Sequence, residues 1–178
     1  MVDITADEVW KAVAAENFMV VGMVSARGGA RTAGVMHQVH DGRVWFTTNE
    51  RLWKARHIAA EPNVSVTVPI AKRIPLLPWI RIPAATVTFC GVAETIPAAD
   101  LHPEVAHALL HGLDVTDGGE LGALIAIGIR PVGDFVTYGV GVSAMGMRDT
   151  EAAAGRVAVD APATAQATAP AVAARVGG

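Results

Sequence analysis

Charged side chains are scarce in this sequence. Asp, Glu, Lys and Arg make up 17% of its 178 residues, against 52% hydrophobic residues. A chain of this length is expected to form one domain with a sizeable core, and so little charge leaves apolar surface that a second subunit can cover. The net charge is −3, so the chain has no excess of basic residues, which argues against nucleic acid as a partner.

Cysteine, a leader sequence and long apolar runs are also lacking. With Cys90 as its one cysteine, the chain forms no internal disulfide, which suits a reducing cytosol. Cys90 lies in the middle of an expected strand, so we expect it in the core. The opening Met1-Val2-Asp3 lacks the basic region of a secretory signal, and no uncharged apolar run reaches about 18 residues. The sequence thus predicts a cytoplasmic protein with no membrane partner.

Short strands dominate the predicted secondary structure. Apolar and β-branched runs between turn residues indicate strands, and apolar residues at helical spacing indicate helices. The expected strands are residues 18–25, 31–40, 43–48, 64–68, 84–95, 121–129 and 135–142, and the expected helices are residues 6–16, 49–61 and 100–111. Six to seven antiparallel strands with two or three flanking helices, and no regular strand–helix alternation, favour a mainly β fold built as a barrel.

Turn residues predict several element boundaries. Asp41-Gly42 suits the positive φ angles of a two-residue hairpin, and Asn49 is a good N-cap for the short helix that follows. A turn over residues 131–134 is expected to join the last two strands, and Gly91 to mark a bulge. The residues expected on the apolar face of the short helix are Leu52, Ala55 and Ala59.

Two segments depart from this pattern. Four prolines in residues 69–83 forbid a long regular element. This segment is apolar and basic, with Lys72, Arg73 and Arg81, so it either closes over a bound cofactor or substrate or packs at a dimer interface. From Glu151 alanine dominates, so we expect residues 1–150 to form the domain and residues 151–178 an extended arm or a disordered tail.

A group of spaced features lies between the hairpin and the strand after the short helix. They are Gly42, the aromatic-rich strand Val44–Asn49, Lys54 about one helical turn later, and the run Glu61-Pro62-Asn63-Val64-Ser65-Val66. This pattern resembles the pyridoxamine-5'-phosphate-oxidase-like superfamily, the flavin-binding split barrels. The resemblance implies a split β-barrel that forms a homodimer and binds a flavin-type cofactor between its subunits.

The resemblance also implies which residues form the cofactor site. In the family, the equivalents of Thr47, Thr48 and Lys54 hold the cofactor phosphate, in keeping with the attraction of anions to a helix start and to lysine. The strand from Val35 to Gln38 would lie along the flavin ring, and Trp53 could stack on a ring system. The cofactor-binding residues are then expected to be Val35, Met36, His37, Gln38, Thr47, Thr48, Trp53 and Lys54.

The sequence departs from the pyridoxamine oxidases themselves at three cationic positions. The residues found there are Ala33 or Gly34, Trp53, and Gln38. Arg31 or Arg51 could replace one of these cations. The departure argues against pyridoxal phosphate synthesis, and it fits the branch that uses FMN or a deazaflavin (coenzyme F-420) or binds haem. The acidic tail of a deazaflavin would need further cations, which Lys72, Arg73 and Arg81 could supply.

The expected function is hydride transfer between reduced FMN or deazaflavin and a small organic substrate, with no catalytic residue assigned. One alternative is a haem-binding split barrel, in which His37 or His57 ligates the iron. The other is a non-enzymatic dimer that has lost the cofactor. We expect no metal site, because Glu104, His107 and His111 on one helix face form only a weak pattern.

Overall fold

The computed structural model describes residues 2–71, 84–110, 124–143 and 145–159. Lys72, Arg73, Arg81 and His111, which entered the predictions above, lie outside the described residues. The elements in chain order are α1 (Ala6–Ala14), β1 (Phe18–Val24), β2 (Ala30–Met36), β3 (Gln38–His40), β4 (Arg43–Asn49), α2 (Trp53–Ala60), β5 (Asn63–Ile70), β6 (Ala85–Pro97), η1 (Ala98–Asp100), α3 (Pro103–Leu110), β7 (Leu124–Tyr138), η3 (Gly146–Arg148), α4 (Thr150–Ala153) and β8 (Ala154–Ala158).

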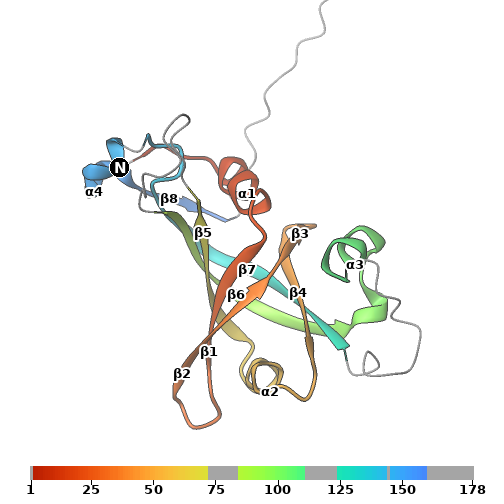
Figure 1. The fold of residues 1–178 in the computed structure, drawn as a ribbon. Helices are drawn as coiled ribbons and strands as arrows, with labels where there is room; N and C mark the ends of the chain where they lie inside the picture. The colour runs from red at the N-terminus through yellow and green to blue at the C-terminus, as the bar shows by residue number, and fades with distance from the viewer. Residues whose placement is uncertain (1, 72–83, 111–123, 144, 160–178) are drawn as a thin grey trace, which may run out of the picture.

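A single antiparallel sheet of eight strands confirms the mainly β prediction, with more strands than the six or seven expected. Its order is β2-β1-β5-β6-β7-β4-β3, with β8 also paired to β7. The strands β2 and β3 follow each other in sequence, yet they lie at opposite ends of this order. The chain changes partner at His37, because Met36 pairs with Phe18 of β1 while Gln38 pairs with Trp45 of β4. The sheet therefore curls back on itself as a half-barrel (Figure 1).

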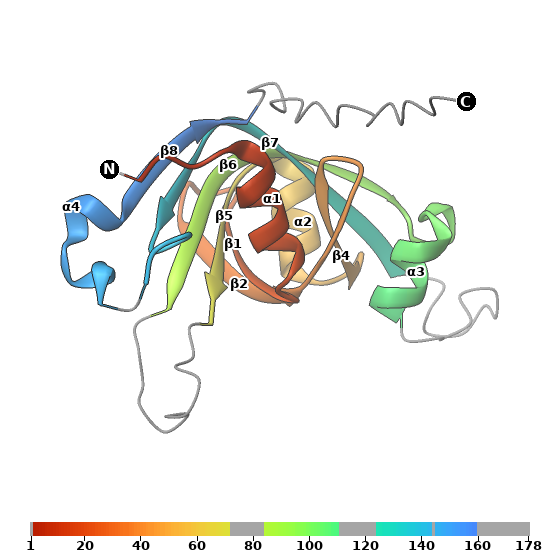
Figure 2. The same cartoon turned by 90° about the horizontal axis from the view of Figure 1, so that it is seen from above.

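Helices α1 and α2 lie at opposite ends of this curl (Figure 1), and Figure 2 shows the strands curving around both. Helix α3 lies outside the curl, beside β4 (Figure 2). The predicted capping box begins α1, because the Thr5 hydroxyl accepts from the Glu8 N–H and the Glu8 carboxylate accepts from the Thr5 N–H. Val9 and Val13 of α1 are fully buried, so this helix is held by its apolar face.

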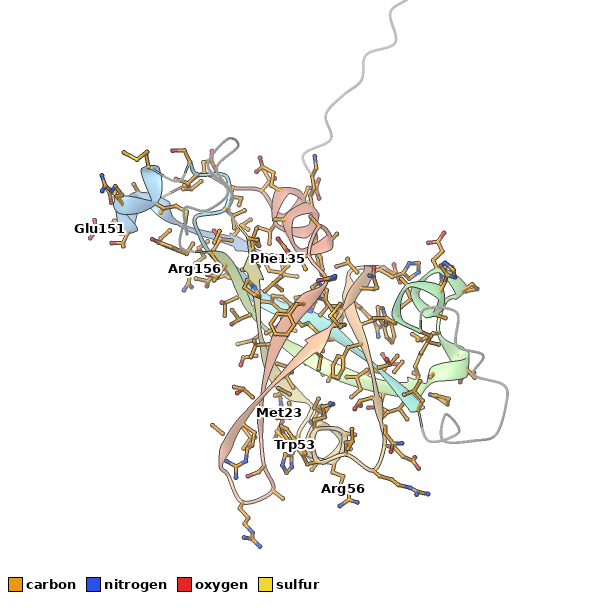
Figure 3. The ribbon with its side chains drawn as sticks, in the orientation of Figure 1. Met23, Trp53, Arg56, Phe135, Glu151 and Arg156 are labelled. Carbon is orange, nitrogen blue, oxygen red and sulfur yellow. The ribbon has the colours of Figure 1, made fainter. Side chains whose placement is uncertain are left out.

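Three phenylalanines form the centre of the core. Phe46, Phe89 and Phe135 come from different strands and are almost fully buried. The ring of Phe135 packs edge-on against Phe89 and against Trp10 of α1, with a centroid separation of 5.4 Å in each pair. Phe135 lies between α1 and the sheet (Figure 3). These ring contacts thus hold α1 against β6 and β7.

The hairpin at Asp41-Gly42 is confirmed by positive φ angles of 49° and 65°. The predicted start of the next helix is wrong, since α2 begins at Trp53 rather than near Asn49. The Asn49 side chain instead accepts a hydrogen bond from the Arg51 N–H at 2.9 Å, which stabilises a turn before the helix. Leu52, which was predicted inside the helix, is its N-cap residue instead.

The apolar face of α2 consequently differs from the predicted one. Its buried residues are Ala55 and Ile58, whereas Leu52 is 44% exposed and Ala59 is exposed. Only Ala55 of the predicted face is therefore correct.

The predicted turn over residues 131–134 is also wrong, because β7 runs straight through it. Pairing with β4 ends at Ile129 and pairing with β8 begins at Asp134. Pro131 lies between these two partners. On that edge of β7 no neighbouring strand needs a hydrogen bond from residue 131, so proline, which has no N–H, is tolerated. The register shift in β6 lies between Thr88 and Cys90 rather than at Gly91.

The end of the described chain joins the sheet. Asp149 caps α4 by accepting from the N–H groups of Glu151 and Ala152, and β8 then pairs along the second half of β7. The change in composition at Glu151 thus falls inside α4. Residues 160–178 lie outside the described part of the chain.

Uncharged residues form the middle of the outer face of the sheet, whereas Arg130, Asp134 and Arg156 lie on the same face along β7 and β8. Two rows of paired residues cross this face, Gly34–Val20–Thr67–Thr88–Val136 and Thr32–Gly22–Ser65–Cys90–Val132. The expectation of a wholly buried β1 is wrong, because Phe18 and Val24 are 42% and 41% exposed. Cys90 is exposed on this face, so its predicted core position is also wrong. Both errors have one cause, since neighbouring residues of a strand face opposite sides of a sheet.

Candidate functional site

A pocket of about 350 Å³ lies where the junction of β2 and β3 meets β4, α2 and α3. Its lining consists of Asn17, Gly34, Val35, Met36, His37, Gln38, Thr47, Lys54, Ala108 and Leu109. Six of the eight predicted cofactor-binding residues are therefore brought together. The pocket is within the size range of small-molecule sites.

The strand segment from Gly34 to Gln38 forms one wall of this pocket. The side chains of Val35 and His37 are buried, whereas Met36 is 50% exposed. Val35 and His37 thus present mainly their backbone to the pocket, and Met36 adds an apolar side chain. Gly34 leaves the backbone uncovered, and a Cβ placed there would come within 2.8 Å of the Phe18 ring. A wall made of backbone and a thioether suits a flat ring better than a compact polar ligand.

The His37 side chain faces α1. Its Nε2 lies 3.2 Å from the Val13 carbonyl oxygen and must donate to it, while the buried Nδ1 has no hydrogen-bond partner in the described part of the chain. Burial lowers the pKa of His37 from its ordinary value of 6.5, an effect opposed by the Val13 hydrogen bond and by the Glu16 charge. His37 is therefore neutral near pH 7, with Nε2 already engaged by the protein.

Thr47 and Thr48 lie on opposite faces of β4. Thr47 lines the pocket, whereas Thr48 is 5% exposed and lies on the same face as the buried Phe46. The Thr48 hydroxyl has no hydrogen-bond partner among the described residues. The sequence correctly identifies this strand, but the alternation of its side chains leaves only Thr47 at the pocket.

Lys54 provides the pocket's positive charge. It is the second residue of α2, is half-buried, and forms no hydrogen bond or ion pair within the described part of the chain. Its ammonium group is thus available to a ligand, close to a helix start whose free N–H groups also attract anions. The other cations proposed for this role lie elsewhere, since Arg31 lines a hollow on the outer sheet face and Arg51 is exposed and does not line the pocket.

Trp53 also lies outside the pocket lining. It is 45% exposed, and its ring lies 5.7 Å from the ring of His57 on the same helix. Figure 3 shows Trp53 and Arg56 on α2, at the end of the molecule away from α1. Trp53 therefore contributes no stacking surface to the pocket in this single chain.

Sequence reasoning missed four lining residues, of which Gly34 directly precedes the predicted segment from Val35 to Gln38. Asn17 joins α1 to β1, and its carbonyl accepts a hydrogen bond from the His37 N–H at 2.9 Å. Ala108 and Leu109 come from α3, more than 50 residues after Lys54 in the sequence. A small polar linker residue and two ordinary helix formers carry no local signal of a site.

The residues present fit a flavin-type group. Met36, Ala108 and Leu109 supply apolar contact for a ring, the β2–β3 backbone supplies hydrogen-bonding groups, and Thr47 with Lys54 supplies an anion-binding end. Among the described lining residues Lys54 is the one cation, so these residues offer an anion fewer positive charges than the pyridoxamine oxidases described above do. No helix in the described part of the chain is long and apolar enough to cross a membrane.

Solved structures share this architecture at low sequence identity. An F420 reductase is 16% identical with a TM-score of 0.50, and the alignment covers 68% of this chain and 91% of that one. An FAD-binding protein from Mesorhizobium loti is 19% identical with a TM-score of 0.55, covering 72% and 90%. A heme-binding protein from Mycobacterium smegmatis is 18% identical with a TM-score of 0.59, covering 89% of this chain but only 60% of that one. At these identities the likeness shows the fold alone.

The sequence itself gives the family. A search of curated proteins finds no match. The family model described as pyridoxamine 5'-phosphate oxidase matches residues 5–114, which is more than half of the chain and includes the β2–β3 wall, Thr47 and Lys54. The chain therefore belongs to the pyridoxamine 5'-phosphate oxidase family of split barrels.

Proposed function

We propose that this protein is a flavin-type oxidoreductase that uses FMN or the deazaflavin coenzyme F-420 to transfer hydride to or from a small organic substrate. One observation carries the proposal: a single pocket joins the β2–β3 backbone, an apolar side and the Thr47–Lys54 anion-binding end. The structural likeness to an F420 reductase and to an FAD-binding protein supports the same class of cofactor. When bound, such a cofactor supplies the hydride chemistry, and the protein supplies position and surroundings.

Each part of the pocket then has a physical task. Lys54 and the Thr47 hydroxyl bind the phosphate, Lys54 through a charge-assisted hydrogen bond. Gly34, Met36 and the neighbouring backbone orient the ring. Leu109 and Ala108 keep water from one side of it, which strengthens the polar contacts inside.

A homodimer would complete the site. Met36 lines the pocket and also belongs to the outer face of the sheet, where its pairing partner Phe18 is likewise exposed. A second copy on the uncharged middle of this face would therefore reach the edge of the pocket. Val136→Asp should convert a dimer to a monomer in light scattering, whereas the isosteric Val136→Thr should leave it dimeric. A monomeric wild type at micromolar concentration would contradict this part of the proposal.

Haem is the second candidate, supported by the fold shared with a heme-binding protein. The placement of His37 argues against it as the iron ligand, because its Nε2 donates to the Val13 carbonyl and its ring is buried toward α1. His57 does not line the pocket either. A cofactor-free dimer is the third candidate. It is favoured by the small positive charge of the described lining residues, among which Lys54 is the one cation.

The deciding experiment is a binding titration of the purified chain with FMN and with coenzyme F-420, followed by flavin fluorescence. We expect one of them to bind, and Lys54→Ala to weaken that binding by roughly 10–100-fold, since a charge-assisted hydrogen bond contributes about 1.5–3 kcal/mol. Arg56→Ala is the matched control, because Arg56 is an exposed cation on the same helix that does not line the pocket.

Three outcomes would count against the proposal. If Lys54→Ala and Arg56→Ala bind the cofactor equally well, the phosphate lies elsewhere. A Soret band in the purified protein would show that it binds haem rather than a flavin. Protein that binds neither cofactor would be the cofactor-free dimer.

A further inference from the structure

A cluster of three metal-ligating side chains lies where the β3–β4 hairpin meets the start of α3. His40 is the last residue of β3, His102 directly precedes α3, and Glu104 is the second residue of α3. One ligand atom from each residue, a ring nitrogen or a carboxylate oxygen, lies within 4.8 Å of the ligand atoms of the other two. The fold thus brings together two imidazoles that are 62 positions apart in the sequence. This cluster shares no residue with the lining of the cofactor pocket.

The backbone on the hairpin side of the cluster is fixed. His40 directly precedes the Asp41-Gly42 turn and pairs with Arg43 across it. The Trp45 indole N–H donates to the His40 carbonyl oxygen at 3.3 Å. The His40 imidazole therefore projects from a hairpin whose backbone has little freedom to move.

The α3 side is fixed by burial. Leu101 and Val105, which flank the other two ligands in sequence, are 7% and 3% exposed and pack in one apolar cluster with Ala126. The His102 carbonyl accepts the N–H of Ala106 at 2.9 Å, which makes His102 the N-cap of the helix. The ligands thus extend toward solvent from an anchored backbone, and binding an ion there would order few additional degrees of freedom.

The three side chains themselves are available. In the part of the chain that the structure describes, none of them makes a hydrogen bond or an ion pair. The rings of His40 and His102 are already stacked, with centroids 4.2 Å apart and an interplanar angle of 22°. Ligand atoms on a tetrahedral zinc ion lie about 3.3 Å apart, given Zn–N and Zn–O distances near 2.0 Å. Because His102 and Glu104 are exposed, small side-chain rotations can close this gap.

We propose that His40, His102 and Glu104 bind a divalent transition-metal ion, of which Zn²⁺ is the best match. Two imidazoles and one carboxylate are a ligand set that zinc takes readily, with water in the fourth position. The ion joins the hairpin to the start of α3. The same helix contributes Ala108 and Leu109 to the cofactor pocket, so the ion also steadies one wall of that pocket.

The test is isothermal titration of tag-free, EDTA-dialysed protein with Zn²⁺. We expect one zinc ion per chain, and a loss of affinity of at least about tenfold in His40→Ala, in His102→Ala and in Glu104→Gln, since even outer-shell changes cost 10–100-fold. Zinc should also raise the melting temperature of the wild type, because a ligand of the folded state stabilises it. Circular dichroism confirms that each variant is folded.

Two controls keep the assignment specific. His107→Ala removes an exposed imidazole from the same helix, outside the cluster, and Cys90→Ser removes the exposed thiol. Both should bind zinc as the wild type does. The proposal is overturned if the wild type takes up no zinc, if His40→Ala binds it unchanged, or if either control loses as much affinity as the cluster variants.

Discussion

Replacing Thr48 with valine should stabilise this protein. The Thr48 side chain is 5% exposed, faces the core beside Phe46, and its hydroxyl has no hydrogen-bond partner among the described residues. An unpaired buried hydroxyl costs about 1–3 kcal/mol. Valine has nearly the same shape and β-propensity as threonine, so the change removes this cost without creating a cavity.

The expected gain can be converted into a melting temperature. We expect Thr48→Val to raise the free energy of unfolding by about 1–2 kcal/mol, which for a domain of this size corresponds to roughly 2–8 °C in Tm. The matched control is Thr47→Val, whose hydroxyl faces the pocket and can be hydrated. It should change the free energy of unfolding by no more than about 0.5 kcal/mol. Urea and thermal unfolding at one fixed protein concentration measure both variants.

The opposite result would refute the reasoning from strand parity. If Thr48→Val destabilises the protein while Thr47→Val does not, the Thr48 hydroxyl is bonded in solution. If Thr48→Val instead weakens FMN or coenzyme F-420 binding and Thr47→Val does not, Thr48 rather than Thr47 holds the phosphate. The first outcome would mean that the buried hydroxyl is paired, and the second would require β4 to present its other face to the pocket.

Two further predictions concern pH and backbone contact. Because the pKa of His37 is lowered in the folded state, the unfolded chain binds the extra proton first, and stability falls as the pH drops below about 6.5. His37→Gln, which keeps a donor for helix α1, should flatten this slope between pH 6.5 and 5 in urea unfolding, and an unchanged slope would contradict the buried placement. Gly91→Ala should cost more than about 1 kcal/mol, because its Cβ would lie 2.9 Å from the Arg130 carbonyl oxygen, whereas Gly34→Ala meets only the movable Phe18 ring and should cost less. Equal melting temperatures for these two variants would contradict the register between β6 and β7.

Local rules in the sequence predicted the elements that depend on a few neighbouring residues. The Thr5–Glu8 capping box and the Asp41-Gly42 hairpin are both confirmed, because each is decided within four residues. The same rules failed for Asn49, which can cap a helix or stabilise a turn with equal chemistry. Its side chain here accepts from the Arg51 N–H in a turn, and α2 begins only at Trp53.

Partners distant in the sequence decide the features that local rules could not reach. Pro131 reads locally as a turn residue, and only the separate ends of β4 and β8 show that it is tolerated inside β7. The break at His37 is similar, because residues 31–40 read as one strand. Its two halves pair with β1 and β4, which occupy different parts of the sheet order. This change of partner curls the sheet. No property of His37 in the sequence predicts that the strand changes partner there.

That same break explains why the site could be predicted in part. Lys54 belongs to the family pattern, and the resemblance implied a role for the strand from Val35 to Gln38, so it located one wall and the cation of the pocket. The opposite wall comes from Ala108 and Leu109, and helix α3 reaches the pocket only because the curl brings β3 against it. An apolar wall needs only apolar side chains of suitable size, so its residues form no sequence pattern that marks a site. The wall on α3 is therefore where we expect substrate preference to be decided among proteins that share the β2–β3 wall and the lysine.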